Sequence, residues 1–264
     1  MGRKLEVGEV LSEVFSIYRA NAGVLIPVAF WLFLVVAIVQ GLAGNSSFLL
    51  LLGAVLSLVA SVLYEGMVVS LVRDIQDGSR DLSVGELYRS VTPVLWPLIG
   101  ASILFAIGVA IGFVLLVVPG LILLTMWAVI APTIVIENRR VTESFGRSRE
   151  LVKGHGWPVF GVVVCAALIT IVVSLVLLTI AAAIADGPIL RIVLGVLAST
   201  VTAPVTALAA AVLYYRLLQL KGDPGPAAPA GPPPAGPTDA DSTDPGPTDA
   251  DPPPAGPPPT GPIA

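Results

Sequence analysis

Trp96-Pro-Leu-Ile-Gly100 and Trp157-Pro-Val-Phe-Gly161 each open a long apolar stretch, and Ile26-Pro27 stands at a similar point near the start of the chain. Each follows a short segment that mixes charged with apolar residues, and each apolar stretch is followed by a turn and a second apolar stretch. This unit occurs three times. The repeat predicts an all-α protein with six transmembrane helices, in which an amphipathic interfacial helix precedes each pair of spans.

Charge is scarce in this chain and unevenly distributed. Of the 264 residues, 55% are hydrophobic and 12% are charged, about half the charged share that is usual in soluble domains. Four stretches carry no charged residue at all, namely 20–64, 90–136, 156–185 and 192–215. A helix needs about 20 apolar residues to cross the hydrocarbon core. The first two stretches are therefore each long enough for two spans.

The spans and turns follow from these stretches. We expect spans near 24–43, 48–72, 94–118, 121–137, 156–184 and 189–217. The turns between paired spans are expected at 44–47, 119–120 and 185–188. A soluble helical core would need polar helix faces, which these spans lack. A membrane β-barrel would alternate apolar and polar residues, which they do not.

The positions of Lys and Arg predict the orientation of the spans. All but one of the 14 Lys and Arg residues fall at the same end of the six predicted spans, and the exception is Arg191. We therefore expect a multi-pass protein of the cytoplasmic membrane with both termini in the cytoplasm. The turns on the other side are very short, which excludes an external binding domain.

Composition changes abruptly at about residue 222. Residues 1–221 form the predicted membrane domain, whereas 222–264 consist mostly of Pro, Gly, Ala, Thr and Asp. This second segment contains no Lys or Arg, and its Asp residues account for the net charge of −4. A segment with so little to bury is predicted to be a disordered cytoplasmic tail. It is either a solvating tail or a proline-rich ligand for a partner.

Candidate contacts with the membrane surface come from the third amphipathic segment and from two tryptophans. Arg147, Arg149 and Lys153 lie on one short predicted helix. Cations near the surface favour anionic lipid by about 1 kcal/mol each. The alternative is that these charges only set the topology. Trp96 and Trp157, at the starts of two spans, are candidate interfacial anchors because tryptophan favours the headgroup level.

Glu65 is a carboxyl-bearing residue inside a predicted span. It lies about seven residues inside the second span, or about 10 Å at 1.5 Å per residue. Ionisable groups at such depth usually face the bundle interior or water. Arg216, at the end of the sixth span, is a candidate partner. Glu65 is interpreted either as a proton or cation relay or as a structural hydrogen-bonding carboxyl.

No pattern in the sequence predicts catalysis. His155 is the only histidine and Cys165 the only cysteine, so the ligand pairs of a zinc site are lacking. The chain has neither a Gly-x-x-x-x-Gly-Lys phosphate loop nor a Gly-x-Ser-x-Gly nucleophile elbow. We therefore expect a protein that is not an enzyme and that needs no cofactor.

Several motifs resemble one known family, the membrane domain that is attached to some bacterial glycerophosphodiester phosphodiesterases and is also found alone. The resemblance covers about residues 5–220. In fused members a separate soluble barrel carries the phosphodiesterase chemistry, with His, Glu and Asp around a metal, and that barrel is missing here. The resemblance implies a bacterial-type cytoplasmic membrane protein without this activity. It rests on Leu82-Ser-Val-Gly-Glu-Leu-Tyr-Arg89, Leu95-Trp-Pro-Leu-Ile-Gly100, Val118-Pro-Gly-Leu121, Ile136-Glu137 and Ser148-Arg-Glu-Leu-Val-Lys-Gly154 followed by Trp157.

These observations predict a non-enzymatic membrane module that organises lipid or holds a partner at the cytoplasmic face, with residues 139–154 as the contact surface. The alternative is a small transporter or channel with a path near Glu65, Pro132 and Pro204, because mid-span prolines bend helices and can mark transport sites. The expected partners are membrane lipids, anionic lipids included, and a cytoplasmic or membrane protein. Nucleic acid is not an expected partner, and the sequence does not predict an oligomeric state.

Overall fold

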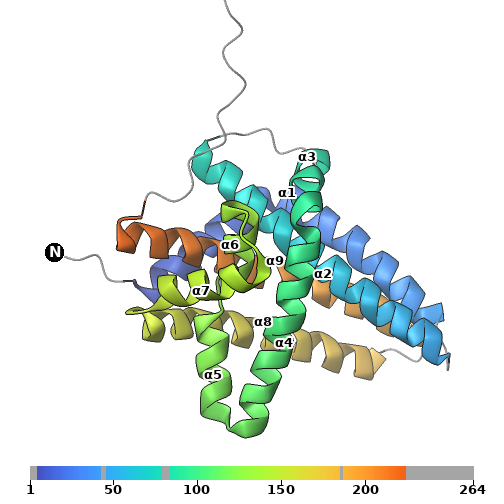
Figure 1. Cartoon of the computed structure of the whole chain (residues 1–264). Coiled ribbons are helices and arrows are strands. Elements are labelled where there is room, and N and C mark those ends of the chain that lie inside the picture. The colour runs from blue at the N-terminus through green and yellow to red at the C-terminus, as the bar shows by residue number, and fades with distance from the viewer. Residues whose placement is uncertain (1–4, 43–45, 79–83, 185–186, 224–264) are drawn as a thin grey trace, which may run out of the picture. The chain divides into compact units, whose positions relative to one another are not determined.

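The computed structural model describes residues 5–42, 46–78, 84–184 and 187–223, and within these ranges the chain is helical and has no strand (Figure 1). The predicted all-α fold is confirmed. The predicted tail lies outside the described residues from 224 onward. The helices are α1 (Val7–Leu42), α2 (Ser47–Asp77), α3 (Val84–Val91), α4 (Leu95–Leu115), α5 (Val117–Met126), α6 (Ile130–Glu137), α7 (Val141–Val152), α8 (Gly156–Ile184) and α9 (Pro188–Lys221), with a 3-10 turn at Thr92–Val94 between α3 and α4.

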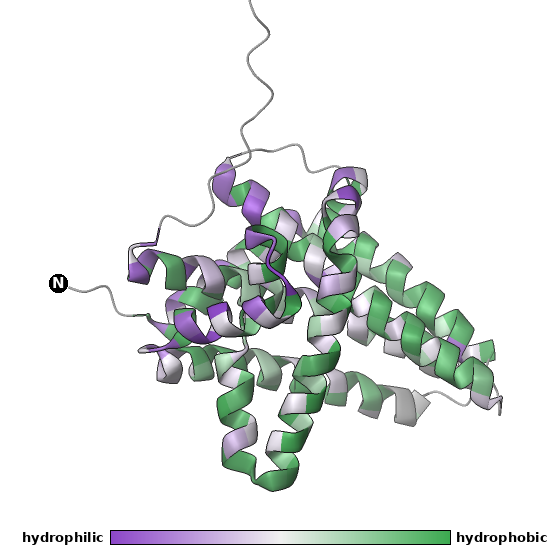
Figure 2. Cartoon of the chain, in the orientation of Figure 1, coloured by the Kyte–Doolittle hydropathy of each residue, from purple (hydrophilic) through white to green (hydrophobic). Residues whose placement is uncertain are grey.

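Six helical segments are long and apolar enough to cross a membrane. They correspond to α1, α2, α3 continued by α4, the pair α5 and α6, α8 and α9. Large apolar side chains cover their outward surfaces, and Trp31, Leu51 and Val114 are each more than half exposed. Figure 2 shows hydrophobic residues along α1, α2, α4 and α5 and hydrophilic ones gathered on α7 and on the last turns of α2 and α9. The chain is a multi-pass membrane protein.

The tightly packed core lies at one end of the spans, which we call the basic end. Here α1 and α8 begin, and α2, α6 and α9 finish. Most residues of α6 and of the second halves of α2 and α9 are buried. The opposite halves of α1, α2 and α8 are largely exposed. The spans therefore hold together mainly at the basic end and offer most of their remaining surface to lipid.

All three predicted amphipathic segments are helical. The first is continuous with the first span in α1, and the junction is Asn21, whose backbone is non-helical (φ −115°, ψ 15°). The second and third are the separate helices α3 and α7. We expected these segments at the membrane interface. Part of each apolar face is buried in the protein core instead, through Val10 and Val14 of α1, Leu87 and Val91 of α3, and Leu151 and Val152 of α7. Phe15, Val84 and Tyr88 remain exposed.

The turn between the third and fourth spans differs from the expected position. We expected it at 119–120, but the backbone breaks at Leu116 (φ −169°, ψ 153°), which ends α4 and begins α5. Pro119 therefore lies in the first turn of α5, where a missing N–H costs no intrahelical hydrogen bond. A Cβ on Gly112 would lie 2.9 Å from the Cα of Gly120, so these two glycines let α4 and α5 touch.

The fourth span is broken in its middle, between Met126 and Ile130. Pro132 explains the break, because it has no N–H for the carbonyl four residues earlier and its ring clashes there. Ser148 of α7 compensates for part of this loss. Its hydroxyl donates to the Met126 carbonyl at 2.8 Å and accepts from the Val129 N–H at 3.4 Å. Irregular backbone at membrane depth persists only where the protein satisfies it, and α7 does so here.

We expect Ser148→Ala to lower the stability of the protein by about 1–3 kcal/mol, because buried backbone groups at the break lose their partner. Ser144→Ala is the matched control. Ser144 is equally buried one turn earlier, and its hydroxyl bonds to the Val141 carbonyl of its own helix. Equilibrium unfolding in mixed detergent micelles measures both. If the two variants lose the same free energy of unfolding, the hydrogen bonds of Ser148 to the broken backbone do not stabilise the protein as proposed.

Candidate functional site

An ionic cluster at the basic end is centred on Glu137, the last residue of α6. Its side chain is 6% exposed. The Nε of Arg147 donates to both carboxylate oxygens, at 2.9 and 3.1 Å. Arg139 donates at 2.5 Å, and the hydroxyl of Tyr214 donates at 2.9 Å. One carboxylate thus joins α6 to α7 and α9.

Arg147 extends this cluster beyond Glu137. Its Nη2 donates to Asp223 at 2.5 Å and its Nη1 to Glu150 at 3.4 Å. Burial lowers the pKa of Arg147, but its hydrogen bonds to Asp223 and Glu137 outweigh this effect and raise the pKa, so the guanidinium stays charged. Asp223 lies beyond the predicted domain boundary at 221–222, yet Arg147 holds it against the helices.

The structure separates the three cations that the sequence placed together as a contact surface. Arg147 is 13% exposed and bonded to carboxylates, so its assignment to a lipid or partner contact is corrected. Arg149 and Lys153 are exposed. They are four residues apart and therefore share a side of the α7 end. Arg140, just before α7, is exposed as well.

The predicted pair of Glu65 and Arg216 does not form. Arg216 pairs instead with Glu13 of α1: its Nε donates to the carboxylate at 2.8 Å, and its Nη2 lies 2.7 Å from the same oxygen. Glu9 lies 3.9 Å from its Nη1. The suggestion that Arg216 partners Glu65 is therefore wrong. The amphipathic part of α1 places its acidic residues beside the end of α9, where they pair with Arg216.

Glu65 lies on α2, between two neighbours that pack tightly. The hydroxyl of Tyr64 donates to the Leu25 carbonyl of α1 at 3.2 Å. Gly66 faces Val91 and Leu98, which a Cβ at this position would meet at 2.6 and 3.2 Å. Glu65 itself is partly exposed. Within the described ranges its carboxylate has no hydrogen bond or ion pair.

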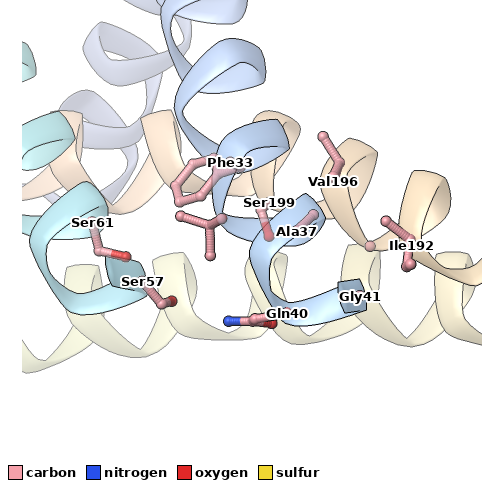
Figure 3. Close-up of a pocket in the computed structure, with 11 residues that line it drawn as sticks. Phe33, Ala37, Gln40, Gly41, Ser57, Ser61, Ile192, Val196 and Ser199 are labelled. Atoms are coloured by element: carbon pink, nitrogen blue, oxygen red, sulfur yellow. The ribbon is translucent and has the colours of Figure 1, made fainter. Parts of the chain in front are cut away.

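A cleft of about 500 Å³ lies between α1, α2 and α9, on the side of the spans away from the basic end (Figure 3). Its polar groups are neutral and come from all three helices. Gln40 belongs to α1, Ser57 and Ser61 to α2, and Ser199 to α9. Sequence reasoning missed this cleft. The available signal was the four-residue spacing of Ser57, Ser61 and Glu65, which puts the three on neighbouring positions of one helix side.

The two predicted anchors are strongly exposed. Trp96 is 79% exposed and Trp157 is 85% exposed. Each is the second residue of its span helix, α4 or α8. Their positions are compatible with the headgroup level, where tryptophan gathers, and the anchoring role stays a prediction.

Comparisons with known proteins do not identify a family. No family model, no curated protein and no solved structure matches this chain. In the part of the chain that the structure describes, no group of three or more His, Cys, Asp or Glu residues is placed to hold a metal ion. The resemblance to the phosphodiesterase membrane domain and the expected lack of enzymatic activity therefore stay predictions.

Arg147→Gln should destabilise the protein by about 3 kcal/mol or more, because it leaves the buried Glu137 carboxylate without its main partner. Arg149→Gln removes an exposed cation and should change stability by less than about 0.5 kcal/mol. Unfolding in mixed micelles compares the two variants directly. If both variants unfold at the same denaturant concentration as the wild type, the Glu137 cluster does not stabilise the basic end.

Proposed function

We propose that the protein is a non-enzymatic module of the cytoplasmic membrane that organises anionic lipid at its basic end. The observation that carries this proposal is the exposure of Arg149, in the last turn of α7, and of Lys153, the residue that follows the helix. Arg147 is bound to Glu137 and Asp223 and plays no part in the contact. The positive-inside rule places this end in the cytoplasm, where the leaflet carries anionic lipid.

The position of Trp157 supports a lipid contact. It follows Lys153 by four residues and is 85% exposed at the start of α8. If Trp157 lies at the headgroup level, as tryptophan prefers, Lys153 lies within reach of phosphate groups. The resemblance to a membrane domain that occurs without its catalytic barrel agrees with a role that is not enzymatic. A cytoplasmic or membrane protein partner at the same residues is the alternative occupant.

The double variant Arg149→Gln, Lys153→Gln should bind phosphatidylglycerol about 30-fold more weakly at low salt, because two surface cations contribute about 1 kcal/mol each. Native mass spectrometry of the protein in a neutral detergent measures the bound lipid. Arg149→Lys with Lys153→Arg keeps both charges and should retain binding. Phosphatidylcholine gives the baseline.

The outcomes of this experiment separate lipid from partner. Unchanged phosphatidylglycerol binding, together with loss of a specific crosslink to one protein in cells, would favour the partner. If both lipid binding and crosslinks survive the double change, the basic end is not a contact surface and these charges only set the topology.

A second candidate function is transport, and the unpaired carboxylate of Glu65 favours it. An ionisable group inside a span is costly and commonly marks an ion pathway. Glu65 follows Ser61, a cleft residue, by one turn of α2. Pro132 and Pro204, which were expected to line the path, are both buried, and neither lines the cleft. Only Glu65 therefore supports this alternative.

Proton flux into liposomes tests the transport alternative. With a potassium gradient and valinomycin, wild-type protein should acidify a dye-loaded lumen, and Glu65→Gln should abolish the signal because the amide cannot release a proton. Glu65→Asp keeps a carboxyl group and should retain part of the flux. Glu65→Gln should still insert into the membrane. Loss of insertion would show that Glu65 is structural, and absence of wild-type flux would discard a proton path.

A further inference from the structure

We propose that the cleft between α1, α2 and α9 binds an uncharged membrane lipid of the acylglycerol class, through hydrogen bonds to the lipid's hydroxyl and ester groups. This site is separate from the basic end and does not depend on the function proposed there. It lies in the membrane-spanning part of the protein, and its polar side chains are Gln40, Ser57, Ser61 and Ser199.

The three serine hydroxyls of the cleft differ from the threonine hydroxyls that bond to their own helices, and they share this with Ser102, Ser174 and Thr200 among the described span residues. Thr170, Thr179 and Thr202 each donate to the carbonyl four residues earlier, at 3.0, 2.8 and 2.8 Å. A span hydroxyl that bonds to its own helix needs no other partner. Within the described residues, the three serine hydroxyls of the cleft make no hydrogen bond. Polar groups at membrane depth require partners, and these three point to a ligand that supplies them.

Gln40 has unused capacity as well. Its side-chain N–H₂ makes one long bond, 3.4 Å, to the Gly53 carbonyl. A glutamine amide offers two donors and an acceptor oxygen. Figure 3 shows Gln40, Ser57, Ser61 and Ser199 around the same space. Together they present both donors and acceptors, which is the pattern that hydroxyl and ester groups match.

The absence of charge in the lining selects the class of ligand. Among the residues whose side chains the structure describes, no Lys, Arg, Asp or Glu lines the cleft. A phosphate-bearing headgroup at this depth would be buried without a counter-ion, at a large cost. An uncharged headgroup loses far less when it leaves water, provided that its hydrogen bonds are made. The lining thus favours a neutral lipid over an anionic one, the reverse of the basic end.

Close helix contacts bound the cleft at one end. A Cβ on Gly41 would lie 2.7 Å from Ile192 Cδ1, and a Cβ on Gly53 would lie 2.8 Å from Gln40 Cγ. These two glycines let α1 approach α9 and α2. Towards the basic end, the rings of Phe33 and Tyr64 pack with centroids 6.0 Å apart.

The remaining walls suit acyl chains. Apolar residues such as Val36, Val196 and Ile192 line the cleft beside the polar ones. The volume of about 500 Å³ lies within the range of about 300–1,000 Å³ that small-molecule sites occupy. Exposed apolar side chains on the same helices, among them Ile38, Val55 and Val193, continue the surface towards the bilayer. A lipid therefore has a route into the cleft from the membrane.

Photolabelling in nanodiscs tests this proposal with the full chain. The probe is a diacylglycerol with a diazirine in one acyl chain, and a phosphatidic acid with the same chains is the charged comparison. We expect the diacylglycerol to label peptides around 33–41, 57–61 and 192–199, and the phosphatidic acid to label them much less. Unlabelled dioctanoylglycerol should displace the probe, and its half-displacing concentration measures affinity.

Two kinds of variant connect the labelling to the cleft. Gly195 lines the cleft, and a Cβ there meets nothing within 4 Å. Gly195→Leu therefore fills the cleft without a clash at Cβ. The helix tolerates the change because leucine favours a helix more than glycine does. Gly23→Leu is the matched control, because Gly23 is also helical, exposed and open. We expect Gly195→Leu to abolish labelling and Gly23→Leu to retain it. Ser61→Ala with Ser199→Ala keeps the volume and should weaken displacement about tenfold through two lost hydrogen bonds.

Each outcome decides the matter. Cleft labelling that Gly195→Leu removes, with discrimination against phosphatidic acid, supports the proposal. Equal labelling by the two lipids would show that the cleft does not select an uncharged headgroup. If Gly195→Leu leaves the labelling unchanged, or if the label falls outside the three segments, the lipid does not bind in the cleft and water alone fills it. If Gly195→Leu does not elute as folded protein, the double variant Ser61→Ala, Ser199→Ala tests the proposal. Thr179→Val is its control, because the Thr179 hydroxyl bonds only to its own helix.

Discussion

The buried carboxylate of Glu137 is the point on which the arrangement at the basic end depends. Three donors from α7, α9 and the α6–α7 link converge on it. A carboxylate taken out of water must be paired to avoid a large penalty. Because Arg147 supplies that pairing, α7 is held beside the end of the fourth span. Ser148, one residue further along α7, is thereby placed where it can bond to the broken backbone at Met126 and Val129.

A similar ion pair, with the positions of the cation and the carboxylate exchanged, joins the first repeat to the rest. Here the cation is on the span helix, at Arg216 of α9, and the carboxylate is on the amphipathic segment, at Glu13 of α1. In both cases an amphipathic segment reaches the end of a span from another repeat. These segments therefore bury part of their apolar faces in the core and place their paired charges at its edge. They connect the repeats in addition to any contact with the membrane surface.

The sequence predicted the number of apolar spans and their helical type because membrane spans follow from local composition. Uncharged stretches such as 90–136 cannot remain in water as exposed helices, whatever their neighbours are. It predicted the turn at Leu116 only to within a few residues, because Pro119 is equally at home in a turn and in the first turn of a helix. Helical periodicity shows which residues share a side, but not which helix lies opposite. Arg147 and Arg216 were for this reason assigned to the wrong environments.

The candidate sites show the same limit. Arg147, Arg149 and Lys153 look equivalent in the sequence, and only the position of Glu137 divides them into one paired, largely covered cation and two exposed cations. Ser57, Ser61 and Ser199 look like ordinary small residues of packed spans, since small residues are common where helices approach. What distinguishes them is the cleft that they line. Its helices are far apart in sequence, and no local pattern reveals a gap between such helices.

The two surfaces that remain open follow one physical rule, which is that charge stays where water can reach it. At the basic end Arg149 and Lys153 are exposed and suit an anionic headgroup at the membrane surface. In the cleft, away from that end, the polar lining is neutral, and hydrogen bonding replaces charge as the means of recognition. Glu65 falls between these two regimes, since it is ionisable yet lies one turn from the neutral cleft. Because no described residue pairs with its carboxylate, Glu65 is the group on which the transport alternative rests.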